Sequence, residues 1–155
     1  MPWPRLHVDC AGPLKGSYYL VVVNSFSKWP EVHKCKKTVS LLHEFFARYG
    51  IPETIESDNG TQFTSDEFRK FCKMLVIEHV TTPPYHSRSN GQAFYDTFKR
   101  VIKKANNEDM NDLALQQFLS VYRVTPNANT PSGMSNAELL FARNRAILLW
   151  GFHCS

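Results

Sequence analysis

The sequence lacks any run of eighteen apolar residues, which excludes a helix of membrane-spanning length among its 155 residues. Its first ten residues, MPWPRLHVDC, do not form a secretory signal peptide, because charge falls inside what would be the apolar region. We therefore expect a soluble, intracellular protein with one globular domain.

Clustered metal ligands are also missing. The four cysteines are scattered without a CxxC pair, and the six histidines do not supply the short, fixed spacings that a zinc module needs. We therefore expect reduced thiols and no zinc-binding domain. The cysteines are Cys10, Cys35, Cys72 and Cys154.

Charge is present in moderate excess, with a formal net charge of +4 and a pI near 8.9. This balance is weak evidence for a nucleic-acid partner. The basic residues gather in two places, after a predicted strand and on one predicted helix, where an ordinary solvated face is the simpler interpretation of the charge alone. They are Lys34, Lys36 and Lys37, and Lys99, Arg100, Lys103 and Lys104.

Strand-type patterns fill the first third of the chain. A short run around His7 and Asp9 ends at Gly12-Pro13, and the continuous run YYLVVV at residues 18–23 is typical of a central strand buried on both faces. Residues 15–17 fit a hairpin turn between these runs. Further strands are predicted around residues 31–35, 54–57 and 76–80.

Helical patterns alternate with the later strands and then dominate. Thr38 is predicted to cap a helix that ends at Gly50, and Ser65 opens a second helix that reaches Leu75. Residues 81–91 form a loop rich in Pro, Ser, Asn and Gly, followed by helices over residues 92–105, 111–122 and 135–141. This order predicts an α/β fold in which helices cover a mixed sheet.

Two aspartates stand at the ends of predicted strands. Asp9 ends the first strand, and Asp58 follows the strand at residues 54–57. Neighbouring carboxylates can hold Mg²⁺, which prefers hard oxygen ligands and keeps positions open for substrate phosphate. Such ions can serve phosphoryl transfer. A single aspartate at a strand end is more often a turn or cap residue, so the surrounding motifs decide between the two interpretations.

Five segments, PWPRLHVDCAGP, YYLVVVNSFSKWPEV, FFARYGIPETIESDNGTQFTSDEF, PPYHSRSNGQA and YRVTPNANTPSGMSNAELLFARNR, occur in an order and spacing typical of one family. Over residues 2–145 the chain resembles the integrase catalytic core of Gypsy-type retrotransposons and their retroviral relatives, whereas residues 146–155 form a tail outside the family pattern. The resemblance implies an RNase H-like fold with a five-stranded mixed sheet flanked by helices. It also implies a DDE-type site that uses Mg²⁺ or Mn²⁺, and DNA (element ends and target DNA) as the partner, hence a nuclear location for action on chromosomal DNA.

In this resemblance Asp9 and Asp58 match the first two catalytic, metal-binding aspartates. The third acid of the family is a glutamate thirty-six positions after the second aspartate, in the pattern GQAER. Position 94 meets that spacing and holds Phe94. The sequence reads GQAFYDTFKR where the family reads GQA, Glu-Arg, an aromatic residue, one further residue and DTFKR. We interpret the difference as a deletion of two residues that removed the glutamate.

The deletion has two expected consequences. Loss of a carboxylate weakens metal binding and misplaces the scissile phosphate, which can cost about 10²-fold in rate. The helix after the deletion turns by about 200° unless the preceding loop takes up the change. Inserting Glu-Arg between Ala93 and Phe94 should therefore restore the site better than Phe94→Glu. Asp96 is a candidate substitute acid, although it is expected to lie about 5 Å too far along the helix.

The resemblance also assigns DNA contacts to a loop and to one helix face. Phosphate contacts from lysines would make the binding sensitive to salt. For the loop residues, ordinary turn chemistry is the alternative interpretation. The loop residues are Tyr85, His86, Ser89, Asn90, Gly91 and Gln92, and the lysines are Lys99 and Lys103.

Three functions follow. The first is an integrase-type DNA recombinase core that is catalytically impaired by the loss of its glutamate. The second is an active polynucleotidyl transferase that uses Asp96, and the third is a domesticated, non-catalytic interaction module. Relatives form homodimers through the first helix, which is several residues shorter here, so this surface is expected to be disturbed. The family's zinc-binding N-terminal domain and C-terminal DNA-binding domain are not expected in this chain.

Overall fold

The computed structural model describes residues 4–14, 16–35, 37–82, 90–104, 112–127 and 130–140. One mixed sheet of five strands has the order β3-β2-β1-β4-β5. Strands β1 and β2, and β2 and β3, are antiparallel, whereas β4 runs parallel to both β1 and β5. The strands are β1 (Arg5–Leu14), β2 (Ser17–Asn24), β3 (Pro30–Lys34), β4 (Thr54–Ser57) and β5 (Glu78–Thr81). The predicted five-stranded mixed sheet is confirmed.

The continuous apolar run in β2 is buried on both faces of the sheet. The last six residues of β2, from Tyr19 to Asn24, are all buried. Consecutive strand residues point to opposite faces, so a strand covered on both faces needs apolar residues at every position. The pattern YYLVVV therefore predicted this strand correctly.

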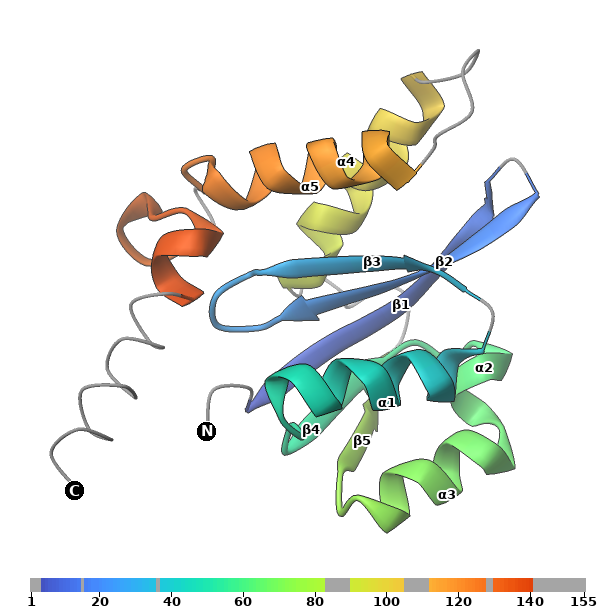
Figure 1. The fold of residues 1–155 in the computed structure, drawn as a ribbon. Coiled ribbons are helices and arrows are strands. Elements are labelled where there is room, and N and C mark those ends of the chain that lie inside the picture. Colours follow the sequence, from blue (N-terminus) through green and yellow to red (C-terminus); the bar gives the residue numbers. More distant parts are fainter. Residues whose placement is uncertain are drawn as a thin grey trace, which may run out of the picture.

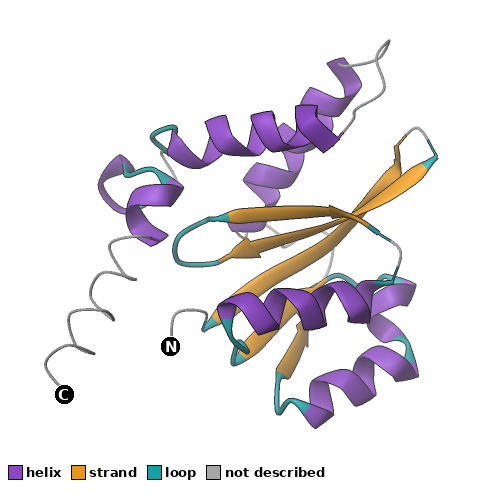
Figure 2. Cartoon of the chain, viewed as in Figure 1, coloured by secondary structure: helices purple, strands orange, loops and turns teal. Residues whose placement is uncertain are grey.

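Helices cover the two faces of the sheet (Figures 1 and 2). On one face lie α1 (Thr38–Tyr49), α2 (Thr61–Thr64) and α3 (Asp66–Met74), and on the other lie α4 (Asn90–Lys104) and α5 (Asp112–Val124). Each face has its own apolar cluster. The first contains Leu42, Phe46 and Phe68 against the sheet, and the second contains Phe94 and Phe98. Within the described part of the chain, no helix is long and apolar enough to cross a membrane.

Several predicted boundaries were wrong by a few residues. Thr38 does not cap α1: the cap position is Lys37, whose side chain makes no capping hydrogen bond. Strand β5 begins two residues later than predicted, because Val76 adopts a positive φ of 56° in the turn after α3. The short helix α2 was not predicted. Helix α4 begins at Asn90, so Asn90 and Gly91 belong to its first turn and not to the predicted loop.

Candidate active site

Strands β1 and β4 carry Asp9 and Asp58 to the same edge of the sheet. The parallel register pairs His7 with Glu56, and each aspartate lies two residues further along its own chain segment. Asp58 directly follows β4, which ends at Ser57. Asp9 does not end its strand as predicted, because β1 continues to Leu14. The end of β4 lies beside the middle of β1, and residues two apart on a strand share a face. The parallel pairing of β1 and β4 thus brings Asp9 and Asp58 close together, although they are far apart in the sequence.

Backbone amides orient both carboxylates. The amide of Cys10 donates a hydrogen bond to Asp9 Oδ1 at 2.8 Å, and the amide of Gly60 donates one to Asp58 Oδ1 at 3.0 Å. A Cβ at Gly60 would lie 3.0 Å from Asp58 Oδ1 and 2.8 Å from Gln62 Nε2. This crowding explains why a glycine occupies position 60: a larger residue would displace either the carboxylate or the glutamine.

The charge of Asp58 and the burial of Asp9 both act on the ionisation of Asp9. Burial raises the pKa of Asp9 to about 6, with a further increase from the negative charge of Asp58. The amide of Cys10 and the positive charge of Lys99 act in the opposite direction on this pKa. Burial lowers the pKa of the neighbouring His7, while the charges of Glu56 and Asp58 raise it. The site is therefore a half-buried pair of acids that repel each other and attract a cation.

Helix α4 presents Tyr95 and Lys99 to this pair. The Lys99 Nζ atom lies 4.2 Å from the centroid of the Tyr95 ring. Burial raises the pKa of the Tyr95 hydroxyl, and the charges of Asp9 and Asp58 raise it further. Since both side chains interact electrostatically with the carboxylates, this stripe of α4 faces the acidic pair. Sequence reasoning missed Tyr95, although its i, i+4 spacing from Lys99 was a usable signal.

Phe94 occupies a different environment from the acids. Its side chain is 1% exposed and belongs to the apolar cluster under α4 and α5. The ring stacks on Phe98 with centroids 5.9 Å apart and meets Tyr122 edge-on at 4.9 Å. Asp96 is exposed, and its charge is not among the causes of the raised Asp9 pKa.

The remaining predicted DNA contacts are only partly described by the structure. Tyr85, His86 and Ser89 lie outside the described residues. Four others are placed in α4 by their backbone: Asn90, Gly91, Gln92 and Lys103. Of the predicted site residues, the structure thus brings together Asp9, Asp58 and Lys99. Among the described residues no three His, Cys, Asp or Glu side chains form a group able to hold a metal ion.

The sheet, the two helical layers and the pair of acids on neighbouring parallel strands define a class of protein: an α/β domain with the RNase H-like architecture. The chain belongs to the integrase core domain family, whose model matches residues 5–87, slightly more than half of the 155 residues.

Curated relatives agree with this assignment. The chain is 46% identical over 150 residues, 92% of its length, to the uncharacterized protein K02A2.6 of Caenorhabditis elegans. It is 34% identical over 133 residues to the Gag-Pol polyprotein of feline leukemia virus and 32% identical over 134 residues to that of avian reticuloendotheliosis virus, covering 80% of this chain in both cases. The aligned parts make up only 12%, 8% and 11% of these three proteins, respectively.

Proposed function

We propose that this chain is the catalytic core of an integrase-type DNA recombinase, that Asp9 and Asp58 are its metal-binding acids, and that its catalytic activity is impaired. The family assignment supports integrase chemistry. The observation that carries the site is the effect of its surroundings on Asp9: burial and the charge of Asp58 raise the pKa of this carboxyl. A divalent cation between them would relieve that repulsion.

The donor set fits one hard cation. Two carboxylates, each with one oxygen held by a backbone amide, leave oxygens available to Mg²⁺ or Mn²⁺, and Mg²⁺ is commonly held by one or two carboxylates together with substrate phosphate. When bound, such an ion polarises a phosphoryl oxygen and activates the attacking oxygen. Asp9 and Asp58 would hold it, and binding should be weaker than in a site with three acids.

Lys99 supplies the contact to DNA in this proposal. Its ammonium acts on the same carboxylates that would hold the cation, so a phosphate bound there would lie within reach of a positive side chain. Tyr95 lies under that ammonium and restricts its position through a cation–π contact. Binding through phosphates predicts a strong dependence on salt.

Impairment follows from the missing third acid. Phe94, at the position that the family spacing gives to glutamate, is enclosed in an apolar cluster and has no metal-binding group. Asp96 is exposed, and the charges that act on the Asp9 carboxyl come from Asp58 and Lys99, so we do not assign Asp96 the role of substitute acid.

The decisive assay is disintegration of a branched DNA that joins an element end to target DNA, with Mn²⁺ and the purified chain. We expect binding with activity reduced by about 10²-fold or more relative to a three-acid integrase core. Robust activity that disappears on Asp9→Asn would contradict the impairment. The absence of salt-dependent DNA binding would instead favour a non-catalytic interaction module with no DNA role.

A further inference from the structure

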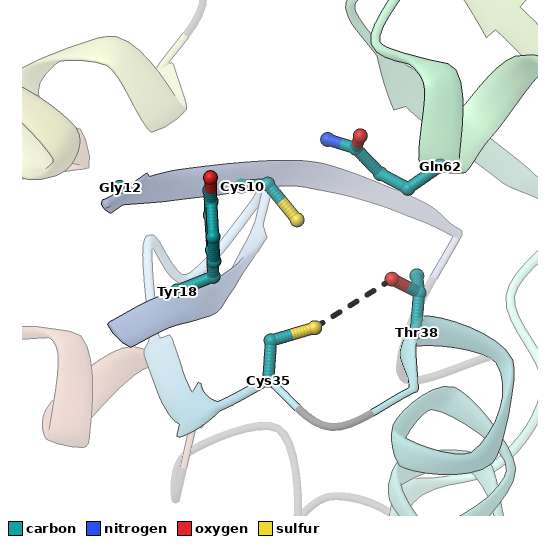
Figure 3. A pocket seen from close by; sticks show the side chains of 6 residues that line it. All are labelled: Cys10, Gly12, Tyr18, Cys35, Thr38 and Gln62. Carbon is teal, nitrogen blue, oxygen red and sulfur yellow. Dashed lines mark hydrogen bonds between the residues drawn. The ribbon is translucent and has the colours of Figure 1, made fainter. Parts of the chain in front are cut away.

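A cavity of about 320 Å³ lies on the face of the sheet that carries α1 and α2 (Figure 3). Its lining comes from β1, β2, α1, α2 and the segment between β3 and α1. The lining residues are Cys10, Gly12, Tyr18, Cys35, Thr38 and Gln62. Asp9 precedes Cys10 on β1, and consecutive strand residues point to opposite faces. The cavity therefore lies behind the acidic pair and is a separate site.

Two free thiols share this cavity. Cys10 and Cys35 are both unbridged and partly buried. The Sγ atom of Cys35 lies 3.8 Å from the Thr38 hydroxyl oxygen, and the Cys10 thiol interacts with both Cys35 and the Gln62 side chain. Figure 3 shows the two sulfur atoms and the Thr38 hydroxyl directed into the same space. Two thiols, a hydroxyl and an amide thus converge from four parts of the fold: β1, the segment after β3, α1 and α2.

The spacing of the two cysteines is wrong for a disulfide. Strand β2 lies between them, because Cys10 pairs with Leu20 on one side of β2 and the Cys35 amide donates to the Tyr18 carbonyl on the other. Neighbouring strands are about 4.8 Å apart, so the two backbones are separated by roughly 9–10 Å. A disulfide needs Cα atoms within about 7 Å. The thiols approach each other only by reaching across β2.

We propose that Cys10 and Cys35 form a binding site for a soft, thiophilic divalent metal ion. Metal–sulfur bonds of about 2.3 Å each let one ion bridge sulfur atoms up to about 4.6 Å apart without movement of the strands. Each thiol gives its proton to solvent as its metal–sulfur bond forms. The Thr38 hydroxyl or water completes the coordination, and the Gln62 amide N–H donates to the Cys10 sulfur. Thiolates select soft ions over Mg²⁺, which separates this site from the carboxylate pair.

Cadmium titration of the reduced full chain tests this site through the ultraviolet charge-transfer band of cadmium thiolate. We expect one ion per chain, unaffected by excess Mg²⁺. Cys10→Ser or Cys35→Ser should weaken binding by at least about 100-fold. Cys72→Ser removes a buried thiol outside the cavity and is the matched control. Asp58→Asn removes the other acid of the pair, whose charge does not act on the Cys10 thiol, and should leave the band unchanged, so a failure of the proposed DNA chemistry remains distinguishable from a failure of this site.

A second measurement needs no variant. Cadmium should protect the peptides containing Cys10 and Cys35 from alkylation, as read by mass spectrometry, and leave the extent of alkylation of the other cysteine peptides unchanged. Equal cadmium affinity in the Cys10→Ser and Cys35→Ser chains would overturn the proposal, and so would loss of the band in Cys72→Ser. A Cys10–Cys35 disulfide in a non-reducing peptide map would contradict the spacing on which the site depends.

Discussion

Lys99 and Asp9, ninety residues apart in the sequence, interact across the edge of the sheet: the ammonium on α4 lowers the pKa of a carboxyl on β1 that burial and Asp58 raise. Tyr95 holds this ammonium 4.2 Å from its ring centroid. A fixed positive charge thus lies beside a pair of acids that also attracts a metal ion. In the proposed function, both the binding of a metal ion and the affinity for DNA depend on this arrangement.

Lys99→Met should weaken DNA binding uniformly across sequences. Because one phosphate contact is lost, the slope of log K against log salt should become less steep by about one. Fluorescence anisotropy with labelled DNA at several salt concentrations measures that slope. Lys70→Met, an exposed change on α3 at the other face of the sheet, is the control and should leave the slope unchanged.

Asp9→Asn should stabilise the metal-free protein while it removes the response to metal. The pKa of Asp9 is raised from 3.8 to about 6, so its charged form costs stability as pH rises through this window. At neutral pH the cost is about 3 kcal/mol at most, which the neutral amide avoids. Thermal unfolding at pH 7 should therefore show a higher midpoint for Asp9→Asn without metal.

Addition of Mg²⁺ or Mn²⁺ should raise the unfolding midpoint of the unmodified chain and leave that of Asp9→Asn unchanged. Asp66→Asn, an exposed carboxylate in the first turn of α3, provides a control of equal charge change. A metal response that survives Asp9→Asn would remove this residue from the metal site.

Glu31 anchors α5 to the sheet, and this contact should fail in acid. Burial alone would raise the pKa of Glu31, but contacts from His33 and Trp29 and the charge of Arg123 hold it at about 2. Arg123 Nη2 lies 3.2 Å from Glu31 Oε1 and 2.7 Å from the Pro30 carbonyl oxygen, and its guanidinium stacks over the Trp29 ring. The ionised carboxylate is therefore part of the folded state.

Because the folded pKa is depressed, this stability is present above the unfolded value of 4.5 and is lost as pH falls towards 2. Glu31→Gln should cost about 3 kcal/mol at pH 7, since Arg123 keeps its charge without its partner. The difference from the unmodified chain should shrink below pH 4.5. Urea unfolding at pH 7, 4.5 and 3 measures it, with the exposed Glu78→Gln as control. A difference independent of pH would contradict the ion pair.

Whether an added glutamate restores activity should depend on its position in α4. Phe94→Glu places it in an apolar cluster, where the lost ring and the buried charge should destabilise the fold by about 3–5 kcal/mol. A Glu-Arg insertion before Phe94 instead places the glutamate two residues before this ring. Gln92 holds that position now, three and seven residues before Tyr95 and Lys99, so it shares their stripe of the helix.

Gln92→Glu and the insertion should therefore both increase disintegration activity with Mn²⁺, whereas Phe94→Glu should lower the folded fraction. Gln117→Glu adds the same charge on an exposed position of α5 and should have no effect. Lys99 already faces Asp9 in the chain without the insertion. The Glu-Arg insertion is therefore not needed to turn Lys99 towards the acids. Recovery with Phe94→Glu alone would show that position 94 reaches the acids.

Much of the fold followed from local patterns in the sequence. The unbroken apolar run of β2 predicted burial on both faces, and the sheet has that strand next to β1. Asp58 follows the end of β4 as predicted, whereas the prediction that Asp9 ends its strand was wrong: β1 continues to Leu14, and the parallel register brings its middle beside the end of β4. Element boundaries were less predictable: the cap of α1 and the start of α4 depend on how the chain enters each helix, which the residue pattern alone does not fix.

The sequence by itself determined the order of strands and helices and the chemical nature of the acidic pair, because periodicity and residue type act over a few neighbouring positions. The tertiary structure decided which side of α4 faces the acids, since burial of Phe94 and Phe98 against the sheet sets the rotation of the helix. It also decided that Cys10 and Cys35 share one cavity and that Arg123 reaches Glu31. Such contacts join distant segments, and only packing of the whole chain brings them together.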